Sequence, residues 1–331
     1  MKIAILDDYQ DQVRRLDCFK LLDGHEVKVF NHSAAGVGQL AIRLANFDAV
    51  VLIRERTVFS AALLKRLPKL KLISQTGKVS GHIDVAAATA GGIAIAEGVG
   101  DPTAPAELTW ALVMAASRRI PEYCANLRDG LWQMSSTNSY HNGMGRVVKG
   151  RVLGIWGYGR IGKLVAGYGR AFGMQVMVWG REPSLRAADH DGYIAASSRE
   201  EFFAQADILS LHLRLNDATA GCVSASDLAR MKSSALLVNT SRAELIVAGA
   251  LEAALSAGKP GFAALDVFES EPIAPDSTLL RRHNVLATPH LGYVEQNSYE
   301  IYFKAAFDNV VAFAAGTPRN ILNLSTTTPP S

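Results

Sequence analysis

The chain has 331 residues, a length that favours two domains over one hydrophobic core. Hydrophobic residues make up 49% of it and charged residues 20%, as in ordinary globular proteins. The formal net charge of +3 is small and dispersed, which argues against nucleic acid or a membrane surface as a partner.

The sequence contains no pattern of a secreted, membrane-spanning or metal-binding protein. The opening MKIAILDDYQ reaches acidic residues too early for the apolar region of a signal peptide. No apolar stretch approaches the roughly 18 uncharged residues of a membrane-spanning helix. The three cysteines lack the paired spacing of zinc sites, and the histidines show neither the tight spacing nor the carboxylate grouping of a metal site. We therefore expect a cytoplasmic protein without a bound metal.

Short apolar runs alternate with helical patterns along nearly the whole chain. Because these runs are apolar throughout, they are typical of strands buried on both faces of a parallel sheet. The predicted strands form two series, residues 2–6, 27–30, 49–53 and 71–74, then 152–156, 175–179, 207–211, 235–239 and 261–265. Helices between them predict an α/β fold with two doubly wound sheets.

Two long helical patterns, at about residues 105–126 and 295–315, define the domain organisation. The second is too short to form a domain, so we expect it to pack on the first domain and make that domain discontinuous. A polar tail at 326–331 is expected to fray. The predicted domains are residues 1–98 with 291–331, and residues 99–290.

A glycine-rich turn follows the predicted strand 152–156 and precedes a helical pattern. It reads Gly157-Tyr158-Gly159-Arg160-Ile161-Gly162, the G-x-G-x-x-G motif in the strand–turn–helix context that dinucleotide binding requires. The first glycine permits the turn, the second lets the backbone approach a pyrophosphate, and the third allows the helix to pack closely on the strand. The sequence therefore predicts that NAD or NADP binds here.

The end of the next strand bears on the choice of cofactor. NAD-preferring sites place Asp or Glu there to bind the ribose 2′-hydroxyl, whereas this chain has Gly180 followed by Arg181. A 2′-phosphate would meet no repulsion, and Arg181, with Arg186 nearby, can pair with it. The pattern favours NADP over NAD, unless Arg181 is a solvated residue or stacks on the adenine of either cofactor.

Three polar segments follow buried strands at the carboxyl ends, where open α/β sheets bind ligands. Reducing a ketone by hydride transfer requires a proton donor for its oxygen and a cation for a neighbouring carboxylate. The segments supply residues of both kinds, and they are Asn239-Thr240-Ser241-Arg242, Ala264–Pro272 and Thr288-Pro289-His290-Leu291-Gly292.

These segments resemble those of the D-isomer-specific 2-hydroxyacid dehydrogenases, which include D-3-phosphoglycerate, D-lactate and glyoxylate/hydroxypyruvate enzymes. The resemblance spans nearly the whole chain and also includes Ile83-Asp84, Ala106-Glu107, Gly130-x-Trp132, Leu211–Leu215 and Met231-Lys232. It implies two Rossmann-like domains around a cleft, with a flavodoxin-like substrate domain. It also implies a homodimer formed through the nucleotide domains.

The resemblance assigns catalytic roles to Arg242, Glu271 and His290. His290 would donate a proton to the carbonyl during reduction, and Glu271 would favour the protonated imidazole near neutral pH. Arg242 would bind the substrate carboxylate and polarise the 2-oxo group. The implied reaction is reversible hydride transfer between NAD(P)H and a small 2-oxo acid, which yields the D-2-hydroxy acid.

Four further residues are expected near the cofactor or beside the catalytic acid. Asp266 matches a position near the nicotinamide, and Thr240 is expected on the cofactor side. His212 is either a cofactor-side or a packing residue. Glu269 competes with Glu271 as the acid, although Glu271 directly precedes a proline, as in the family motif.

The loop expected to bind the substrate carboxylate departs from the family pattern. Lys78 stands where the family has an apolar residue, and Val79 replaces the second of two glycines. The resemblance implies that backbone N–H groups around Gly77, Lys78 and Val79 meet the carboxylate. Lys78 would then favour a second anionic group on the substrate, unless its side chain extends into water.

Arg54 and Arg56 resemble positions that bind phosphate-bearing substrates of the family. Glu55 between them fits a solvated, salt-bridged turn equally well.

Three other assignments share this fold. Formate dehydrogenases have Gln where this chain has Glu271, whereas phosphite dehydrogenases keep a similar triplet. The C-terminal binding protein corepressors retain the fold and the residues as NAD(H)-sensing modules that do not depend on turnover. Such a module would need a partner-docking groove, which nothing in the sequence indicates.

Overall fold

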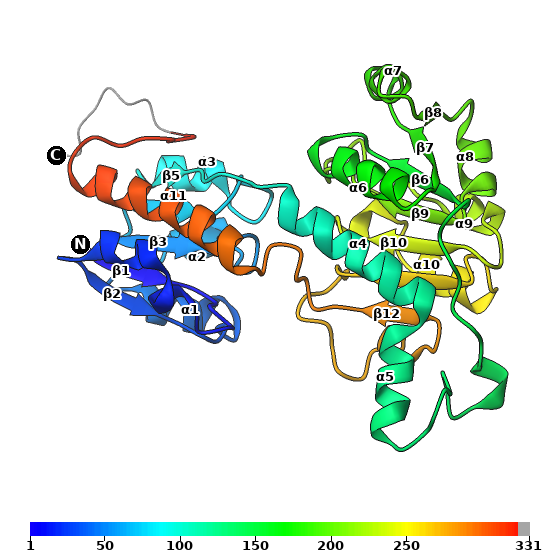
Figure 1. Cartoon of the computed structure of the whole chain (residues 1–331). Helices are drawn as coiled ribbons and strands as arrows, with labels where there is room; N and C mark the ends of the chain where they lie inside the picture. The colour runs from blue at the N-terminus through cyan, green and yellow to red at the C-terminus, as the bar shows by residue number, and fades with distance from the viewer. Residues whose placement is uncertain (324–331) are drawn as a thin grey trace. The chain divides into compact units, whose positions relative to one another are not determined.

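The computed structural model describes residues 1–323, so the tail predicted to fray at 326–331 lies outside the described residues. The chain divides into two compact units. Unit 1 consists of Met1–Asp101 and the chain from Glu295, and unit 2 consists of Pro102–Val294. The sequence placed both boundaries a few residues earlier. Each unit is built on a parallel sheet with helices, which confirms the predicted α/β class (Figure 1).

Within residues 1–323, the sheet of unit 1 has five parallel strands in the order β2-β1-β3-β4-β5, the flavodoxin-like order. The side chains of β3 and β4 are buried on both faces, which explains their uninterrupted apolar runs. The sequence missed β5, a strand of only three residues. The strands are β1 (Lys2–Ile5), β2 (Glu26–Val29), β3 (Ala49–Leu52), β4 (Leu72–Gln75) and β5 (Ala94–Ala96).

The helices of unit 1 include α11, which returns from unit 2 and packs on this sheet (Figure 1). Glu295 caps its first turn by accepting hydrogen bonds from two backbone N–H groups. The Ser74 hydroxyl on β4 donates to the Ala306 carbonyl at 2.8 Å, deep in the core. The helices are α1 (Gly36–Leu44), α2 (Ala61–Leu64), α3 (Val85–Ala90), α11 (Gln296–Ala314) and the 3-10 turns η1 (Val13–Arg15) and η2 (Asp17–Leu22).

The described part of unit 2 contains a seven-stranded parallel sheet in the order β12-β11-β10-β9-β6-β7-β8. Five of these strands lie where the sequence predicted them, and β12 falls in the apolar run 284–287 that precedes the His290 segment. The sequence missed the edge strand β8, which has only two residues. The strands are β6 (Val152–Trp156), β7 (Gln175–Trp179), β8 (Ile194–Ala195), β9 (Ile208–Leu211), β10 (Leu236–Asn239), β11 (Phe262–Leu265) and β12 (Val285–Ala287).

The single helix expected at 105–126 is two helices, so that prediction was wrong. The break falls at Arg119, whose φ of 54° is left-handed. Pro121 lies in the first turn of the second helix, where it has no N–H to continue the first one. The helices are α4 (Thr103–Arg118), α5 (Ile120–Arg128), α6 (Arg160–Ala171), α7 (Glu182–His190), α8 (Arg199–Gln205), α9 (Ala225–Arg230) and α10 (Ala250–Ser256), with 3-10 turns η3 (Ser139–His141), η4 (Ala243–Leu245) and η5 (Leu279–Arg281).

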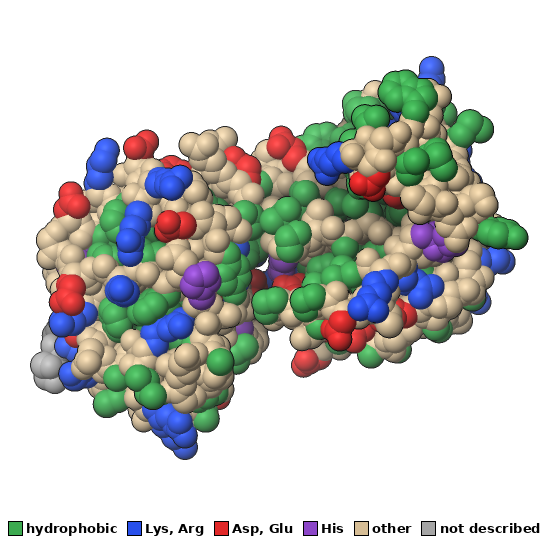
Figure 2. All heavy atoms as spheres, turned by 90° about the horizontal axis from the view of Figure 1, so that it is seen from below, with side chains coloured by type: hydrophobic (Ala, Val, Ile, Leu, Met, Phe, Trp, Pro, Cys, Tyr) green, Lys and Arg blue, Asp and Glu red, His purple; other side chains and the backbone are tan. Residues whose placement is uncertain are grey.

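The surface shows mixed charge. On the face drawn in Figure 2, Lys and Arg side chains are interspersed with Asp, Glu and neutral groups. Over residues 1–323, no helix combines the length and the apolar character needed to cross a membrane.

Candidate active site

The glycine turn joins β6 to α6 and leaves no room for side chains at two positions. Gly157 has a φ of 103°, and a Cβ there would lie 2.6 Å from the His212 carbonyl oxygen. A Cβ at Gly162 would lie 2.1 Å from the Gly157 carbonyl oxygen. The turn is therefore closed against the sheet, and the first turn of α6 presents N–H groups that have no acceptor within the helix. These features fit a dinucleotide pyrophosphate.

Tyr158, predicted to bind the cofactor, turns its side chain into the protein. Its hydroxyl donates to Asp191 at 2.7 Å, and its ring meets Tyr193 edge-on. Burial and this hydrogen bond raise the pKa of Tyr158, while the same bond, with His190 and Lys163, lowers the pKa of Asp191 to about 2. Only the backbone of Tyr158 remains available to a ligand.

The Gly162→Ala variant should lose dinucleotide binding. The added methyl group collides with backbone rather than with a side chain that could move, so the turn and α6 must separate. The matched control is Gly167→Ala on the same helix, where a Cβ meets open space and should stabilise the helix by up to about 1 kcal/mol. Titration followed by NADPH fluorescence gives the affinity of each variant for the cofactor. Wild-type affinity in Gly162→Ala would contradict the close-packing argument.

Directly after β7, at the predicted cofactor-selecting position, the chain has Gly180 and the basic Arg181 in place of an acidic residue. Arg181 is exposed and has no ion pair among the described residues, whereas Arg186 pairs with Glu182 at 3.2 Å. A Cβ at Gly180 would approach the Ser184 side chain at 3.3 Å, so the Ser184 hydroxyl also lies at this edge. Arg181, rather than Arg186, is the guanidinium available to a ligand.

His212 and Thr240, both predicted near the cofactor, form hydrogen bonds within unit 2. The His212 Nε2 atom lies 2.9 Å from the Ser210 hydroxyl, and burial lowers the pKa of His212 to about 4, so the ring is neutral at pH 7. The Thr240 hydroxyl is 2.7 Å from the hydroxyl of Thr109 on α4, which fastens the end of β10 to that helix.

Asp266 follows β11, is fully buried, and organises the segment that carries His290. Its carboxylate accepts hydrogen bonds from the Thr288 hydroxyl at 2.6 Å, the Leu291 N–H at 2.7 Å and the Gly292 N–H at 2.9 Å. Burial raises the pKa of Asp266, and the three donors limit that rise. The sequence assigned Asp266 to the cofactor, and contacts of its carboxylate with the histidine segment could only be found from the structure.

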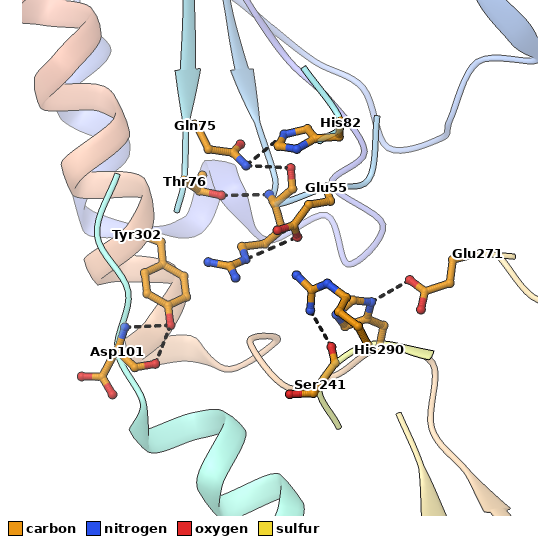
Figure 3. A network of polar contacts seen from close by, with 11 residues as sticks. Glu55, Gln75, Thr76, His82, Asp101, Ser241, Glu271, His290 and Tyr302 are labelled. Atoms are coloured by element: carbon orange, nitrogen blue, oxygen red, sulfur yellow. Dashed lines mark hydrogen bonds and ion pairs between the residues drawn. The ribbon is translucent and has the colours of Figure 1, made fainter. Parts of the chain in front are cut away.

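His290 and Glu271 form a close pair (Figure 3). His290 has a left-handed φ of 53°, and its Nδ1 lies 2.6 Å from one oxygen of Glu271. The other oxygen accepts the Phe268 N–H at 2.9 Å. Burial opposes the charge on Glu271, but the hydrogen bond and charge of His290, with the Phe268 N–H, hold the pKa of Glu271 below its usual value. Glu271 is therefore ionised at neutral pH.

Arg242 follows the carboxyl end of β10 and directly precedes the 3-10 turn η4. Its backbone carbonyl accepts a hydrogen bond from the Asn239 side chain at 2.9 Å, and its guanidinium donates to the Ser241 carbonyl at 2.6 Å. Its charge also helps to lower the pKa of Glu271. Unit 2 thus holds an imidazole, a carboxylate and a guanidinium in electrostatic contact.

In unit 1, the loop expected to bind the substrate carboxylate already contacts a carboxylate of the protein. This is the side chain of Glu97, which directly follows β5. One Glu97 oxygen lies 2.8 Å from the Lys78 ammonium group, and the other accepts the Val79 N–H at 2.9 Å. Lys78 is therefore a paired charge, and the Val79 N–H is engaged. Sequence reasoning missed Glu97 because nothing in the sequence relates it to residues nineteen positions earlier. Gly77 and the Lys78 backbone remain for a substrate.

Arg54 lies directly over Gly77. Its backbone N–H donates to the Thr76 hydroxyl and its carbonyl accepts from the Gln75 amide, both at 3.0 Å, and Figure 3 shows these side chains at the end of the sheet. A Cβ at Gly77 would lie 2.1 Å from an Arg54 guanidinium nitrogen. Arg56 instead donates to the Asp7 carbonyl at 2.6 Å. The side chain that lies against the substrate loop is therefore that of Arg54 and not that of Arg56.

A family profile described as D-isomer specific 2-hydroxyacid dehydrogenase, NAD binding domain, matches residues 110–292. The glyoxylate reductase of Aeropyrum pernix is 39% identical over 266 residues, which cover 79% of this chain and 78% of that protein.

Solved structures are similar over nearly the whole chain. An oxidoreductase from Ralstonia solanacearum is 57% identical, with a TM-score of 0.96 over 99% of this chain and 98% of that one. A phosphoglycerate oxidoreductase from Vibrio cholerae o395 is 56% identical, with a TM-score of 0.92 over 95% and 99%. The chain therefore belongs to the D-isomer-specific 2-hydroxyacid dehydrogenase family, NAD(P)-dependent enzymes that interconvert 2-oxo acids and D-2-hydroxy acids, as its motifs predicted.

Proposed function

We propose that His290 is the proton donor of this enzyme, and the observation that carries the proposal is its 2.6 Å contact with Glu271. Because Glu271 engages Nδ1, Nε2 is the atom left to deliver a proton to the carbonyl oxygen. Arg242 binds the substrate carboxylate, and the Asp266 carboxylate holds the His290 segment in position. A bound nicotinamide supplies the hydride during reduction and accepts it during oxidation.

The cofactor we propose is NADP rather than NAD. The end of β7 carries Gly180 and the exposed Arg181, with the Ser184 hydroxyl beside them. A 2′-phosphate would find a guanidinium and a hydroxyl there, and the 2′-hydroxyl of NAD would lack its usual carboxylate acceptor.

Arg181→Ala should weaken the binding of NADPH about 10- to 100-fold and change the binding of NADH little. The reason is that a hydrogen bond to a charged group contributes about 1.5–3 kcal/mol. Arg186→Ala, on the helix that Arg181 precedes, is the matched control, because Glu182 already pairs with the Arg186 charge. Values of Kd for both cofactors measure the effect. An equal loss for NADPH and NADH would remove the argument for NADP.

The substrate class we propose is a short 2-oxo acid, with its carboxylate at Gly77 and the Lys78 backbone. Arg54 over Gly77 provides a further cation for a second anionic group on the substrate. The relatives named for glyoxylate and for phosphoglycerate represent a substrate without such a group and one with it.

A panel of 2-oxo acids tests this function. The purified enzyme is assayed with NADPH and NADH against glyoxylate, hydroxypyruvate, pyruvate and 3-phosphohydroxypyruvate, and the loss of reduced-nicotinamide absorbance is followed. We expect turnover that is highest with a short or a phosphorylated acid and is lost on His290 substitution. Arg54→Ala should raise KM most for the phosphorylated acid. Absence of turnover with every acid would refute the proposal.

The assembly we propose is a homodimer, in which a second copy covers the segment after α5. This segment extends away from the sheet of unit 2 (Figure 1) and exposes large apolar side chains. Trp132 is 74% exposed, Tyr140 94%, Met144 88% and Val147 70%. Such a concentration of exposed apolar groups is typical of a protein interface.

Light scattering after gel filtration tests the dimer. The wild-type chain should elute with the mass of two copies, and the double variant Trp132→Ser/Tyr140→Ser should shift toward one copy. Ile42→Ser, at an 82% exposed position in unit 1, is the control and should not change the mass. A monomeric wild-type enzyme would exclude this assembly.

A further inference from the structure

A small pocket lined by both charged and apolar residues opens in unit 1, and no residue of the substrate loop lines it. It lies at the carboxyl ends of β1, β2 and β3, where the strand order β2-β1-β3 reverses. The chain leaves β1 toward one edge of the sheet and returns to it on the other side at β3. In open α/β sheets such a reversal forms a crevice in which ligands bind.

The pocket has a volume of about 190 Å³, enough for a small group of atoms in place of several waters. Its polar wall comes from four segments, and its apolar floor from Leu6, Val37 and Leu40. The polar lining consists of Asp7 after β1, Ser33 after β2, Arg43 on α1, and Arg56 and Thr57 after β3.

Arg43 is held in place while part of its guanidinium remains available. One nitrogen donates to the His32 carbonyl at 2.7 Å, and the guanidinium lies 4.9 Å from the centre of the Phe30 ring. Among the described residues, no acceptor is recorded for its other N–H groups. A guanidinium fixed at one side and available at the other is suited to an anion.

Arg56 and Asp7 complete the charged lining. Arg56 is fixed by the Asp7 carbonyl at 2.6 Å and by the Tyr299 hydroxyl at 3.3 Å. The carboxyl of Asp7 is buried and accepts a hydrogen bond from the Thr57 hydroxyl. Burial raises the pKa of Asp7, which weakens the opposition of this carboxyl to an incoming anion. Two guanidiniums thus face one carboxyl.

We propose that this pocket binds a small oxyanion, either a phosphate or a carboxylate group, through Arg43 and Arg56, with the Ser33 hydroxyl as a further contact. The site is separate from the substrate loop at Gly77 and from the glycine turn, so it would be a second ligand site on this enzyme. Asp7 limits its affinity, because its carboxyl lines the same space.

Hydrogen exchange measured by mass spectrometry tests the site on the full-length enzyme. The enzyme is first saturated with NADP, so that phosphate cannot occupy the glycine turn, and is then titrated with inorganic phosphate or with acetate at constant ionic strength. We expect either probe to slow exchange in peptides covering residues 30–43, which contain Ser33 and Arg43 and no residue of the substrate loop. The probe that acts at the lower concentration identifies the oxyanion class.

Three variants decide between a site and a general salt effect. Arg43→Ala should weaken the protection about 10- to 100-fold, the loss expected for a charged hydrogen bond. Asp7→Asn should strengthen it, and Arg66→Ala, an exposed arginine of the same unit, should leave it unchanged. Protection that is absent in the wild type, or that responds equally to all three variants, overturns the proposal. The opposite sign expected for Asp7→Asn keeps the test valid if Arg43→Ala folds poorly.

Discussion

His290→Gln should lower kcat for 2-oxo acid reduction by about 10³-fold and leave the Kd for NADPH nearly unchanged. Glutamine keeps polar atoms beside Glu271 but has no proton of suitable acidity to give to the carbonyl oxygen. His283→Gln, an exposed histidine of the same unit, is the control and should retain wild-type turnover. Unchanged kcat in His290→Gln would show that the proton comes from another group.

Substitution of Glu271, the partner of His290, should change the pH dependence of the rate. Glu271 is ionised at neutral pH and one of its oxygens lies 2.6 Å from the His290 ring, so Glu271→Gln removes a negative charge beside the proton donor. We expect a rate about 10²-fold lower, with the decline of reductive activity moved to lower pH. Glu269→Gln is the matched control two residues away. If Glu269→Gln moved the profile and Glu271→Gln did not, the two carboxylates would exchange roles.

Asp266→Ala should destabilise unit 2 by about 3–5 kcal/mol, the range expected when one partner of a buried charged network is removed. The Thr288 hydroxyl and the Leu291 and Gly292 N–H groups would lose their acceptor inside the protein. Asp276→Ala, on the exposed segment after β11, is the control and should unfold like the wild type.

Thermal unfolding with and without NADPH measures this effect. Asp266→Asn should fall between the wild type and Asp266→Ala, because the amide keeps one acceptor oxygen. At temperatures where Asp266→Asn remains folded, its kcat should still be reduced, since the His290 segment has lost part of its support. Wild-type stability in Asp266→Ala would contradict the organising role of this carboxylate.

Many features of this enzyme follow from local sequence patterns. Uninterrupted apolar runs predicted most strands of both sheets, because a buried parallel strand needs apolar side chains on both faces. The glycine turn was equally readable, since steric exclusion at Gly157 and Gly162 admits one residue type. Family resemblance predicted catalytic roles for Arg242, Glu271 and His290, and each of them follows a strand that the sequence indicated by an apolar run.

The tertiary structure alone decided which partner each polar side chain has. Tyr158 lies in the cofactor motif yet donates to Asp191, and Lys78 lies in the substrate loop yet pairs with Glu97. Asp266 holds the His290 segment. These contacts join residues far apart in sequence, so their energies depend on the packing of whole elements. Sequence patterns carry the steric and hydrophobic rules of one element at a time, whereas a hydrogen bond between elements exists only once both have been placed.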